Sequence, residues 1–448
     1  MLRWSGALAS LSDADRRALL ERTSSHDAAI RERTAAIVAR VQRDGDVALR
    51  ALAQELDGVA LERLEISRAR CRVALDALAP SLRGALERSA ENIGRVHRAF
   101  RPVAQETESE PGIIVGRRPD PLGRVGVYAP GGRAAYPSSV LMGTVPARVA
   151  GVGEIVLCSP PSRETGLPSS VVLAAAALAG ADRVFALGGA GAIAAMAYGT
   201  ASVPRVDRIV GPGNAYVAEA KLQVSSVVAI DSPAGPSELL VLCDDNADPA
   251  LVAREMLAQA EHDPLSAVVA VTTTERSARA IITELAAQLP AQPRAEISRA
   301  ALASQGAVLW AASLGDGVAF ANAYAAEHLL LDVGPLDGTL ARLRNAGTVF
   351  VGPTASVAFG DYMTGANHVL PTGGLARSYS GLSTLDFVRW TTYQRVTPEA
   401  AARLADDVGV FADAEQLPGH ASAARAWRTS IAGSPDAAGA TGAPGAAR

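Results

Sequence analysis

The sequence Arg-Val-Gly-Val-Tyr-Ala-Pro-Gly-Gly occupies residues 124–132 and joins a short apolar run to a turn. An apolar run of this length that stops at Pro and Gly is typical of a buried β-strand. Helical periodicity follows at residues 138–149, and another apolar run begins at residue 154. A strand, a helix and a second strand in this order predict a parallel βαβ unit.

This alternation repeats downstream in two series. The first series has strands at 154–158, 183–187 and 208–210 and helices at 169–179 and 192–198. The second series has strands at 227–230, 238–243, 267–272, 307–311 and 348–351 and helices at 248–260, 275–289 and 315–326. Both series predict doubly wound parallel sheets with helices on both faces. Ligands of such sheets bind beyond the carboxyl ends of the strands.

The predicted fold class is therefore α/β, with two related, incomplete Rossmann-like domains, one inserted in the other, and helical segments at both ends. The N-terminal patterns at 13–22, 27–56 and 68–100 are helical and carry no fingerprint of chemistry. The expected division is an N-terminal helical arm (1–25), a main α/β domain (26–127 and 235–382), an inserted α/β domain (128–234), a C-terminal helical segment (383–433) and a disordered tail rich in Ala, Gly and Pro (434–448).

Composition narrows the class of protein. The chain has 448 residues, of which 49% are hydrophobic and 20% charged, and its net charge is −4. Neither this composition nor the net charge favours nucleic acid or an anionic membrane as a partner. No apolar stretch is long enough to span a bilayer. The three cysteines are widely spaced and form neither a CxxC pair nor a disulfide framework. A cytoplasmic enzyme is the expected class.

A polar cluster ends the helix predicted at 248–260. Gln259 and His262 are three residues apart, so they share a helix face, and Pro264 limits how far the helix runs. An imidazole and an amide oxygen that leave one helix end together suit a metal or a polar ligand. A solvated helix end is the alternative interpretation.

Histidine placement adds to this hypothesis. Of six histidines, His26 and His97 lie in helical scaffold and are interpreted as surface or satisfied core residues. The other four stand where helix or strand gives way to loop, each with Glu or Asp nearby: His262, His328, His368 and His420. Imidazole and carboxylate are zinc ligands, although no HExxH or CxxC motif is present. The Glu327–His328 pair suits proton transfer, because histidine titrates near neutrality and a dry carboxylate activates water.

Several glycine-rich or proline-rich loops are candidate binding turns. Residues 189–194 match GxGxx(G/A) after a strand, with Asp207 near the distance of a ribose-binding acid. Residues 130–132 and 211–214 also suit a close backbone approach to a phosphate or nicotinamide. The loop at 230–238 presents Ser237, and a plain turn is the alternative there.

These residues together resemble the histidinol dehydrogenase family over roughly residues 30–425. The resemblance rests on ordered blocks: GRVGVYAPGG, VDRIVGPGNAYVAEAK, IDSPAGPSELLV, QAEHDP, AEHLLL, GDYMTGANHVLPTGG and the Glu415/His420 pair. It implies a zinc-dependent homodimer with one Zn²⁺ per subunit that oxidises L-histidinol to L-histidinal and then L-histidine with two NAD. These are the last two steps of histidine biosynthesis.

The resemblance also implies roles for individual residues. The implied metal ligands are Gln259, His262, Asp361 and His420. The implied catalytic pair is Glu327 and His328. Substrate contacts are implied for Ser237, Gln259, His262, His328, Asp361, His368, Glu415 and His420, and NAD contacts for Tyr128, Gly191 and Asn214 in the inserted domain. The C-terminal segment is implied to cross to the partner subunit, so that Glu415 and His420 complete the other chain's site.

The chemistry and one departure leave alternatives open. Covalent aldehyde oxidation needs a reactive thiol, and Cys158 and Cys243 lie in apolar runs. A hydrated aldehyde is therefore the expected second substrate, with its water activated by Glu327. Gly191 stands where the family usually carries Gln beside the cofactor. A related dehydrogenase of another small alcohol, or a non-catalytic metal-binding protein, are the alternative functions.

Overall fold

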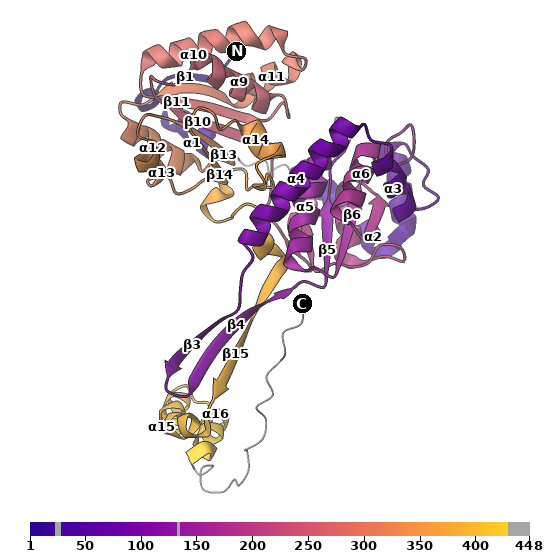
Figure 1. Cartoon of the computed structure of the whole chain (residues 1–448), viewed down its shortest axis with the longest axis vertical. Coiled ribbons are helices and arrows are strands. Elements are labelled where there is room, and N and C mark those ends of the chain that lie inside the picture. The colour runs from indigo at the N-terminus through magenta and orange to yellow at the C-terminus, as the bar shows by residue number, and fades with distance from the viewer. Residues whose placement is uncertain (23–27, 132–134, 429–448) are drawn as a thin grey trace. The chain divides into compact units, whose positions relative to one another are not determined.

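The computed structural model describes residues 1–22, 28–131 and 135–428. They divide into two compact units (Figure 1). The first comprises Met1–Arg101 with Pro121–Val388, and the second comprises Pro102–Asp120 with Arg389–Arg448. The first unit contains two six-stranded sheets and the second is built on a three-stranded sheet. In the described ranges, no helix has the length and apolar character needed to cross a membrane.

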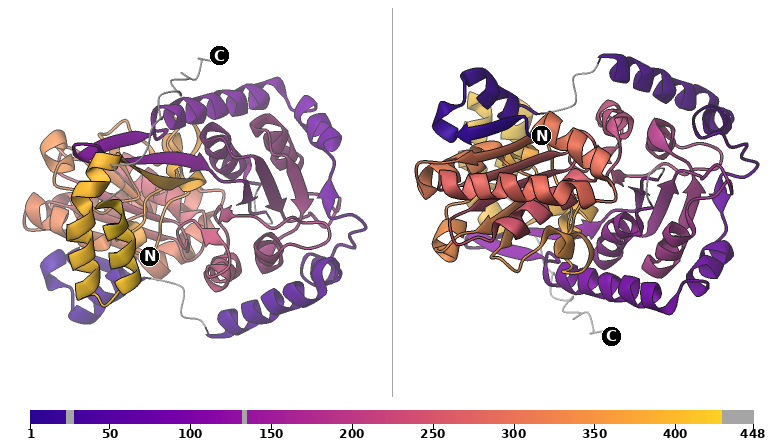
Figure 2. Two further views of the ribbon diagram at one scale, coloured as in Figure 1. Left: turned by 90° about the horizontal axis from the view of Figure 1, so that it is seen from below. Right: turned by 90° about the horizontal axis from the view of Figure 1, so that it is seen from above.

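One sheet of the first unit, the β10 sheet, is entirely parallel. Its strands in spatial order are β1 (Trp4–Ala7), β12 (Gly306–Trp310), β11 (Ala267–Thr272), β10 (Glu238–Cys243), β13 (His328–Asp332) and β14 (Thr348–Val351). Leu239 and Val241 face one core with α9 (Pro249–Ala260), α10 (Glu275–Gln288) and α11 (Ala295–Gln305). Leu240 and Leu242 face the opposite core with α1 (Asp13–Leu20) and α12 (Leu314–Tyr324). Helices thus cover both faces (Figure 2).

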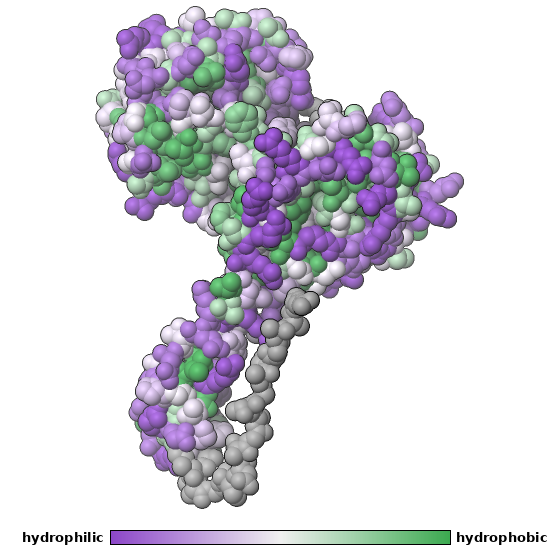
Figure 3. Space-filling model, in the orientation of Figure 1, coloured by the Kyte–Doolittle hydropathy of each residue, from purple (hydrophilic) through white to green (hydrophobic). Residues whose placement is uncertain are grey.

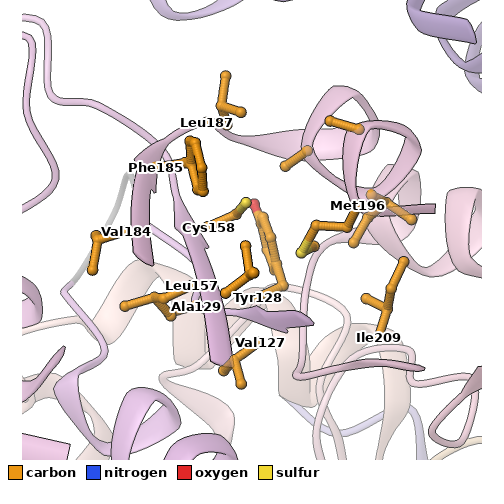
Figure 4. Close-up of a cluster of buried hydrophobic side chains, with 14 of the residues drawn as sticks. Val127, Tyr128, Ala129, Leu157, Cys158, Val184, Phe185, Leu187, Met196 and Ile209 are labelled. Carbon is orange, nitrogen blue, oxygen red and sulfur yellow. The ribbon is translucent and has the colours of Figure 1, made fainter. Parts of the chain in front are cut away.

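The other sheet, the β5 sheet, is parallel except at one edge, where β2 pairs antiparallel with β7. Its order is β2 (Glu65–Ile66), β7 (Arg183–Ala186), β6 (Glu154–Ser159), β5 (Arg124–Tyr128), β8 (Arg208–Val210) and β9 (Ala229–Ile230). The helices that pack with it are α2 (Ala28–Leu52), α3 (Arg68–Asp76), α4 (Pro80–Ala99), α5 (Pro137–Ala150), α6 (Ser170–Ala179), α7 (Gly189–Tyr198) and α8 (Ala215–Val224). Tyr128, Cys158, Phe185 and Met196 meet in its core (Figure 4).

The predicted α/β class with two parallel-sheet units is confirmed, and the β5 unit is inserted in the chain between β1 and β10. The expected domain boundaries need correction. Residues 28–99 were expected in the main domain, but α2, α3 and α4 pack against α5, α6, α7 and α8 of the β5 unit. Their apolar faces, with Val41, Leu49 and Ile93, share its core. The expected helical arm at 1–25 contains β1, which forms an edge of the β10 sheet.

The expectation of an entirely helical segment at residues 383–433 is wrong, because this segment begins with a long strand. The sheet of the second unit has the order β15 (Val388–Val396), β4 (Ile113–Pro121) and β3 (Gln105–Glu110), followed by α15 (Pro398–Ala414) and α16 (Pro418–Arg425). β-Branched and aromatic residues dominate β15, which favours a strand. Apolar residues lie on the surface of the body that carries α15 and α16 (Figure 3), and Val410, Phe411 and Trp427 are exposed. The predicted tail at 434–448, like His26 and Gly132, falls outside the described residues.

Candidate active site

The candidate catalytic residues meet at the amino ends of the β10-sheet strands. Ser237 immediately precedes β10, Glu327 immediately precedes β13, and His328 is the first residue of β13. The register pairs His328 with Leu239 on one side and with Thr348 on the other. The expectation of a site beyond the carboxyl ends is therefore wrong for this sheet, because α9 ends at Ala260 and the chain re-enters the sheet from the amino side.

Glu327 is buried and held in one orientation. Its Oε2 atom accepts hydrogen bonds from the hydroxyl of Ser237 at 2.7 Å and from the backbone N–H of Glu238 at 2.6 Å. The side-chain amide of Gln259, from the last turn of α9, donates in turn to the Ser237 hydroxyl. Two donors on one oxygen hold the carboxylate in place, and a carboxylate positioned in this way can accept a proton from water.

His328 is buried beside Glu327 and lies between two carboxylates. Its Nδ1 atom is 2.9 Å from the carbonyl oxygen of Glu238, and a carbonyl only accepts, so Nδ1 carries a proton. Nε2 points toward Asp361, 3.6 Å from Oδ1, and makes no hydrogen bond within the described part of the chain. Burial alone would lower the pKa of His328, but the charges of Glu327 and Asp361 outweigh it and raise the pKa well above its ordinary value.

Asp361 links two further histidines of the first unit, His262 and His368, to the site. It lies in α14 (Val357–Tyr362), and its carbonyl oxygen is 3.0 Å from Nδ1 of His368. Burial would raise the pKa of Asp361, but His328, then His368 and His262, lower it overall, so these groups share one electrostatic field. Burial lowers the pKa of His368. The structure thus brings together the predicted site residues of the first unit: Ser237, Gln259, His262, Glu327, His328, Asp361 and His368.

The two remaining candidates belong to the second unit. Glu415 directly follows α15 and His420 lies in α16, and both are exposed. Within the part of the chain that the structure describes, no group of three or more His, Cys, Asp or Glu side chains is arranged to hold a metal ion. The metal-ligand set that includes His420 therefore stays a prediction.

The predicted cofactor residues line the carboxyl edge of the β5 sheet. Tyr128 ends β5, and its hydroxyl accepts from the backbone N–H of Gly189 at 3.0 Å, while burial raises its pKa to about 12. The side chain of Asn214 caps α8, accepting from the N–H groups of Tyr216 and Val217. A cavity of about 490 Å³ opens beyond β5 and β6, lined by residues that include Pro130, Gly131 and Ser159. The sheet therefore has room for a ligand where its topology predicts one.

A buried ion pair fixes the turn at residues 211–214. Lys221 pairs with Asp231, the Lys221 ammonium donates to the carbonyl of Gly211 at 3.1 Å, and the N–H of Gly211 donates to Asp231 at 2.7 Å. Gly211 has φ +114°, and a Cβ there would lie 2.1 Å from the carbonyl oxygen of Tyr128. Only glycine fits where this turn crosses Tyr128.

Two expected cofactor contacts are placed differently. Asp207 accepts from the N–H of Arg124 at 2.8 Å, at the amino end of β5, so its proposed role with a ribose beyond the carboxyl ends is wrong. Gly191 is buried in α7, and a Cβ there would lie 3.2 Å from Cδ1 of Leu52 in α2. A side chain at residue 191 would therefore point toward the contact between α2 and α7.

Two buried charged residues behind the Glu327–His328 pair could not be predicted from the sequence. Arg22 follows α1, and Glu238 opens the otherwise apolar strand β10. The only available signal was one acidic residue at the start of an apolar run, which equally suits an exposed strand end. Their pairing depends on a separation of 216 residues along the chain.

Two parallel-sheet units, with a buried Glu–His pair at one edge and a ligand-sized cavity at another, define a two-domain α/β enzyme. The histidinol dehydrogenase family model matches residues 20–428. The chain is 44% identical to histidinol dehydrogenase of Methanosarcina mazei, covering 94% of this chain and 96% of the relative, and 49% identical to that of Halobacterium salinarum, covering 93% and 97%. The chain belongs to the histidinol dehydrogenase family and is an oxidoreductase.

A solved structure agrees with this assignment. The crystal structure of histidinol dehydrogenase from Elizabethkingia anophelis matches with a TM-score of 0.91 and 32% sequence identity, covering 96% of this chain and 98% of that chain. The resemblance inferred from the ordered sequence blocks is thereby confirmed.

Proposed function

We propose that this chain oxidises L-histidinol to L-histidine through L-histidinal with two NAD and a zinc ion, as the last two steps of histidine biosynthesis. The observation that carries the proposal is the buried Glu327–His328 pair, with both side chains held by Ser237 and Glu238. The pair supplies a base for an alcohol proton and a second base for water.

His328 is proposed to take the proton of the alcohol in the first oxidation. Because Nδ1 is engaged by the carbonyl of Glu238, Nε2 is the nitrogen left to accept the proton. Glu327 and Asp361 favour the protonated ring that the transfer produces, and a zinc ion held by Asp361 would offset part of this effect before the transfer, so that Nε2 could accept the proton. The same ring then passes protons on in the second step.

Glu327 is proposed to activate the water that hydrates the aldehyde. The three cysteines are all buried, and burial raises the pKa values of Cys158 and Cys243. An inert thiol cannot form the covalent adduct of thiol-dependent aldehyde oxidation. A gem-diol that loses a hydride is the route that these residues support.

The donor chemistry fits a zinc ion. Gln259, His262 and Asp361 offer an amide oxygen, an imidazole and a carboxylate, and His420 of another copy would add a second imidazole. A bound zinc ion would hold the amino alcohol and imidazole of the substrate in place. Ser237, His368 and Glu415 are the proposed additional substrate contacts. NAD, which accepts the hydrides, is proposed to bind at the carboxyl edge of the β5 sheet, where Tyr128 ends β5, Asn214 caps α8 and a cavity opens beyond β5 and β6.

Homodimerisation completes the proposal. Val408, Val410 and Phe411 of α15, with Leu417 and Trp427 after it, expose apolar side chains that a single chain leaves uncovered. Exposed apolar patches of this kind mark protein interfaces. Two chains would then share their sites, with Glu415 and His420 of each chain serving the other.

The purified protein, loaded with zinc, should reduce two NAD for each histidinol consumed. Treatment with EDTA should abolish this activity, and added zinc should restore it. If the zinc-loaded protein did not turn over histidinol but turned over another small alcohol, that alcohol would replace histidinol as the assigned substrate.

A further inference from the structure

A buried ion pair lies directly behind the Glu327–His328 pair. The Arg22 guanidinium makes two parallel hydrogen bonds to the Glu238 carboxylate, at 2.9 and 2.7 Å. The two side chains are only 2% and 3% exposed. The guanidinium also lies 3.5 Å over the ring of Tyr324, so its orientation is fixed from a second direction.

Glu238 touches both members of the proton-transfer pair through every polar group it has. Its backbone N–H donates to the carboxylate of Glu327 at 2.6 Å, and its carbonyl oxygen accepts from Nδ1 of His328 at 2.9 Å. Its side chain accepts from the backbone N–H of Glu327 at 3.3 Å and from that of Gly373 at 2.7 Å. One residue thus fixes the backbone and carboxylate of Glu327 and the ring of His328.

Burial of this ion pair costs free energy, so the stability of the fold does not explain it. Burying two charges carries a large desolvation cost, and a well-packed apolar pair is often equally stable. The pair also places the carboxylate of Glu238 close to that of Glu327, where like charges repel. Arg22 supplies the opposing charge to both. A stable core alone would not require this geometry.

We propose that Arg22 and Glu238 are positioning residues that set the geometry of Glu327 and His328 for proton transfer. This inference rests on the proposed function, because it assigns a purpose to that same pair. Neither residue needs to touch the substrate. Glu238 acts through its hydrogen bonds, and Arg22 acts by holding the Glu238 carboxylate in place with two hydrogen bonds.

Glu238→Gln tests the proposal with little change of shape. The amide places an N–H group where an oxygen now accepts from Arg22 or from a backbone N–H, so one of these contacts is lost. We expect kcat to fall by at least about tenfold, while KM for histidinol stays within about twofold, because positioning acts on the transition state. Arg22→Lys, which keeps the charge but loses the two-point contact, should give an intermediate kcat.

Chemical rescue gives a second, independent readout. Arg22 and Glu238 both line a cavity of about 590 Å³, so a small cation can reach the Glu238 carboxylate in Arg22→Ala. Guanidinium chloride at a concentration too low to unfold the protein should restore part of kcat in this variant. Sodium chloride at the same ionic strength should not. Equal effects of the two salts would overturn the role of Arg22.

The matched control is Asp182→Asn, at the residue that precedes β7 in the β5 unit. Asp182 also pairs with an arginine, Arg148, and accepts from a backbone N–H, that of Ile155 at 2.8 Å. Its loss should lower the melting temperature and leave kcat unchanged. If folded Glu238→Gln keeps wild-type kcat, or changes only KM, the positioning proposal is overturned. If Glu238→Gln does not fold, the double variant Arg22→Met/Glu238→Gln, which leaves no unpaired charge, replaces it with the same expected loss of kcat.

Failure of the proposed function would be visible separately. In that case the wild-type protein itself would not turn over histidinol. Crystal structures of wild-type protein and Glu238→Gln would then decide the positioning role. Displaced Glu327 and His328 side chains in the variant would support it, and unchanged side chains would overturn it.

Discussion

Nε2 of His328 lies 3.6 Å from Oδ1 of Asp361 and makes no hydrogen bond to any residue that the structure describes, although the ring is buried. The opposite nitrogen is occupied by a backbone carbonyl, so the proton-accepting capacity of the ring is directed toward Asp361. A carboxylate at this distance stabilises a proton arriving on Nε2. The two carboxylates therefore act on the two nitrogens of the ring, because Glu327 lies beside Nδ1 and Asp361 faces Nε2.

Glu327→Gln should slow the second oxidation more than the first. The amide cannot take a proton from water, whereas His328 is still present to accept the alcohol proton. We expect the rate of histidinal oxidation to fall by about 10²- to 10⁴-fold, with a smaller effect on the alcohol step. Rapid-mixing measurements of NADH formation from histidinol and from histidinal would compare the two. Equal loss of both steps would contradict the assignment of Glu327.

Mixing two inactive variants should restore activity if the sites are shared between chains. His262→Ala removes a proposed ligand from the first unit, and His420→Ala removes one from the second. After equal mixing and reassembly, half of the dimers contain both chains and each of these has one intact site, so about a quarter of wild-type activity should return. Sites contained within single chains would give no recovery.

The zinc content of the same two variants provides a control for that experiment. Each separate variant should bind less zinc than wild-type protein, because each has lost an imidazole ligand from every site. The mixture should regain zinc in parallel with activity. Activity that returned without zinc would argue against the proposed ligand set.

Protonation of His97 should lower the free energy of unfolding at acidic pH. His97 is 2% exposed, neither ring nitrogen has a hydrogen-bond partner among the described residues, and burial lowers its pKa to about 4. In the unfolded chain the His97 imidazole has a pKa near 6.5, so it binds a proton more tightly there than in the folded protein. Stability is therefore fully present above pH 6.5 and falls as the pH drops toward 4, by about 3 kcal/mol.

Urea unfolding as a function of pH would measure this loss. His97→Leu, which has nothing to protonate, should show a smaller decline between pH 6.5 and 4 than wild-type protein. An unchanged pH dependence in this variant would assign the acid sensitivity to other groups.

Gly191→Gln should destabilise the β5 unit. A Cβ at this position would lie 3.2 Å from Leu52 and 3.7 Å from Leu49, so the larger side chain overpacks the contact between α2 and α7. We expect a loss of about 1–3 kcal/mol in the free energy of unfolding. Thermal unfolding would measure it, and KM for NAD would show whether the added amide reaches the cofactor.

Gly84→Ala in α4 is the matched control for Gly191→Gln. A Cβ at residue 84 meets no atom within 4 Å, and the position is helical. Alanine there should raise stability by up to about 1 kcal/mol through its better helix propensity. A loss of stability in both variants would point to a general effect of replacing helical glycines.

The sequence by itself determined the α/β class, because strand and helix periodicities alternate regularly from residue 124 onward. Its ordered blocks also determined the family and identified Ser237, Gln259, Glu327, His328 and Asp361 as one set. These signals are local, because each block contains its own turn, cap or pair of polar residues. The order of the blocks is visible in the sequence itself.

Only the tertiary structure decided which elements share a core and at which edge the site lies. The amphipathic pattern of α2, α3 and α4 shows that each buries one face, but not which sheet receives it, and that sheet was the β5 sheet. Likewise, β1 joins β12 across some three hundred residues, and Arg22 reaches Glu238 across the β10 unit. Contacts at such separations depend on the relative stability of whole packings, so no local pattern contains them.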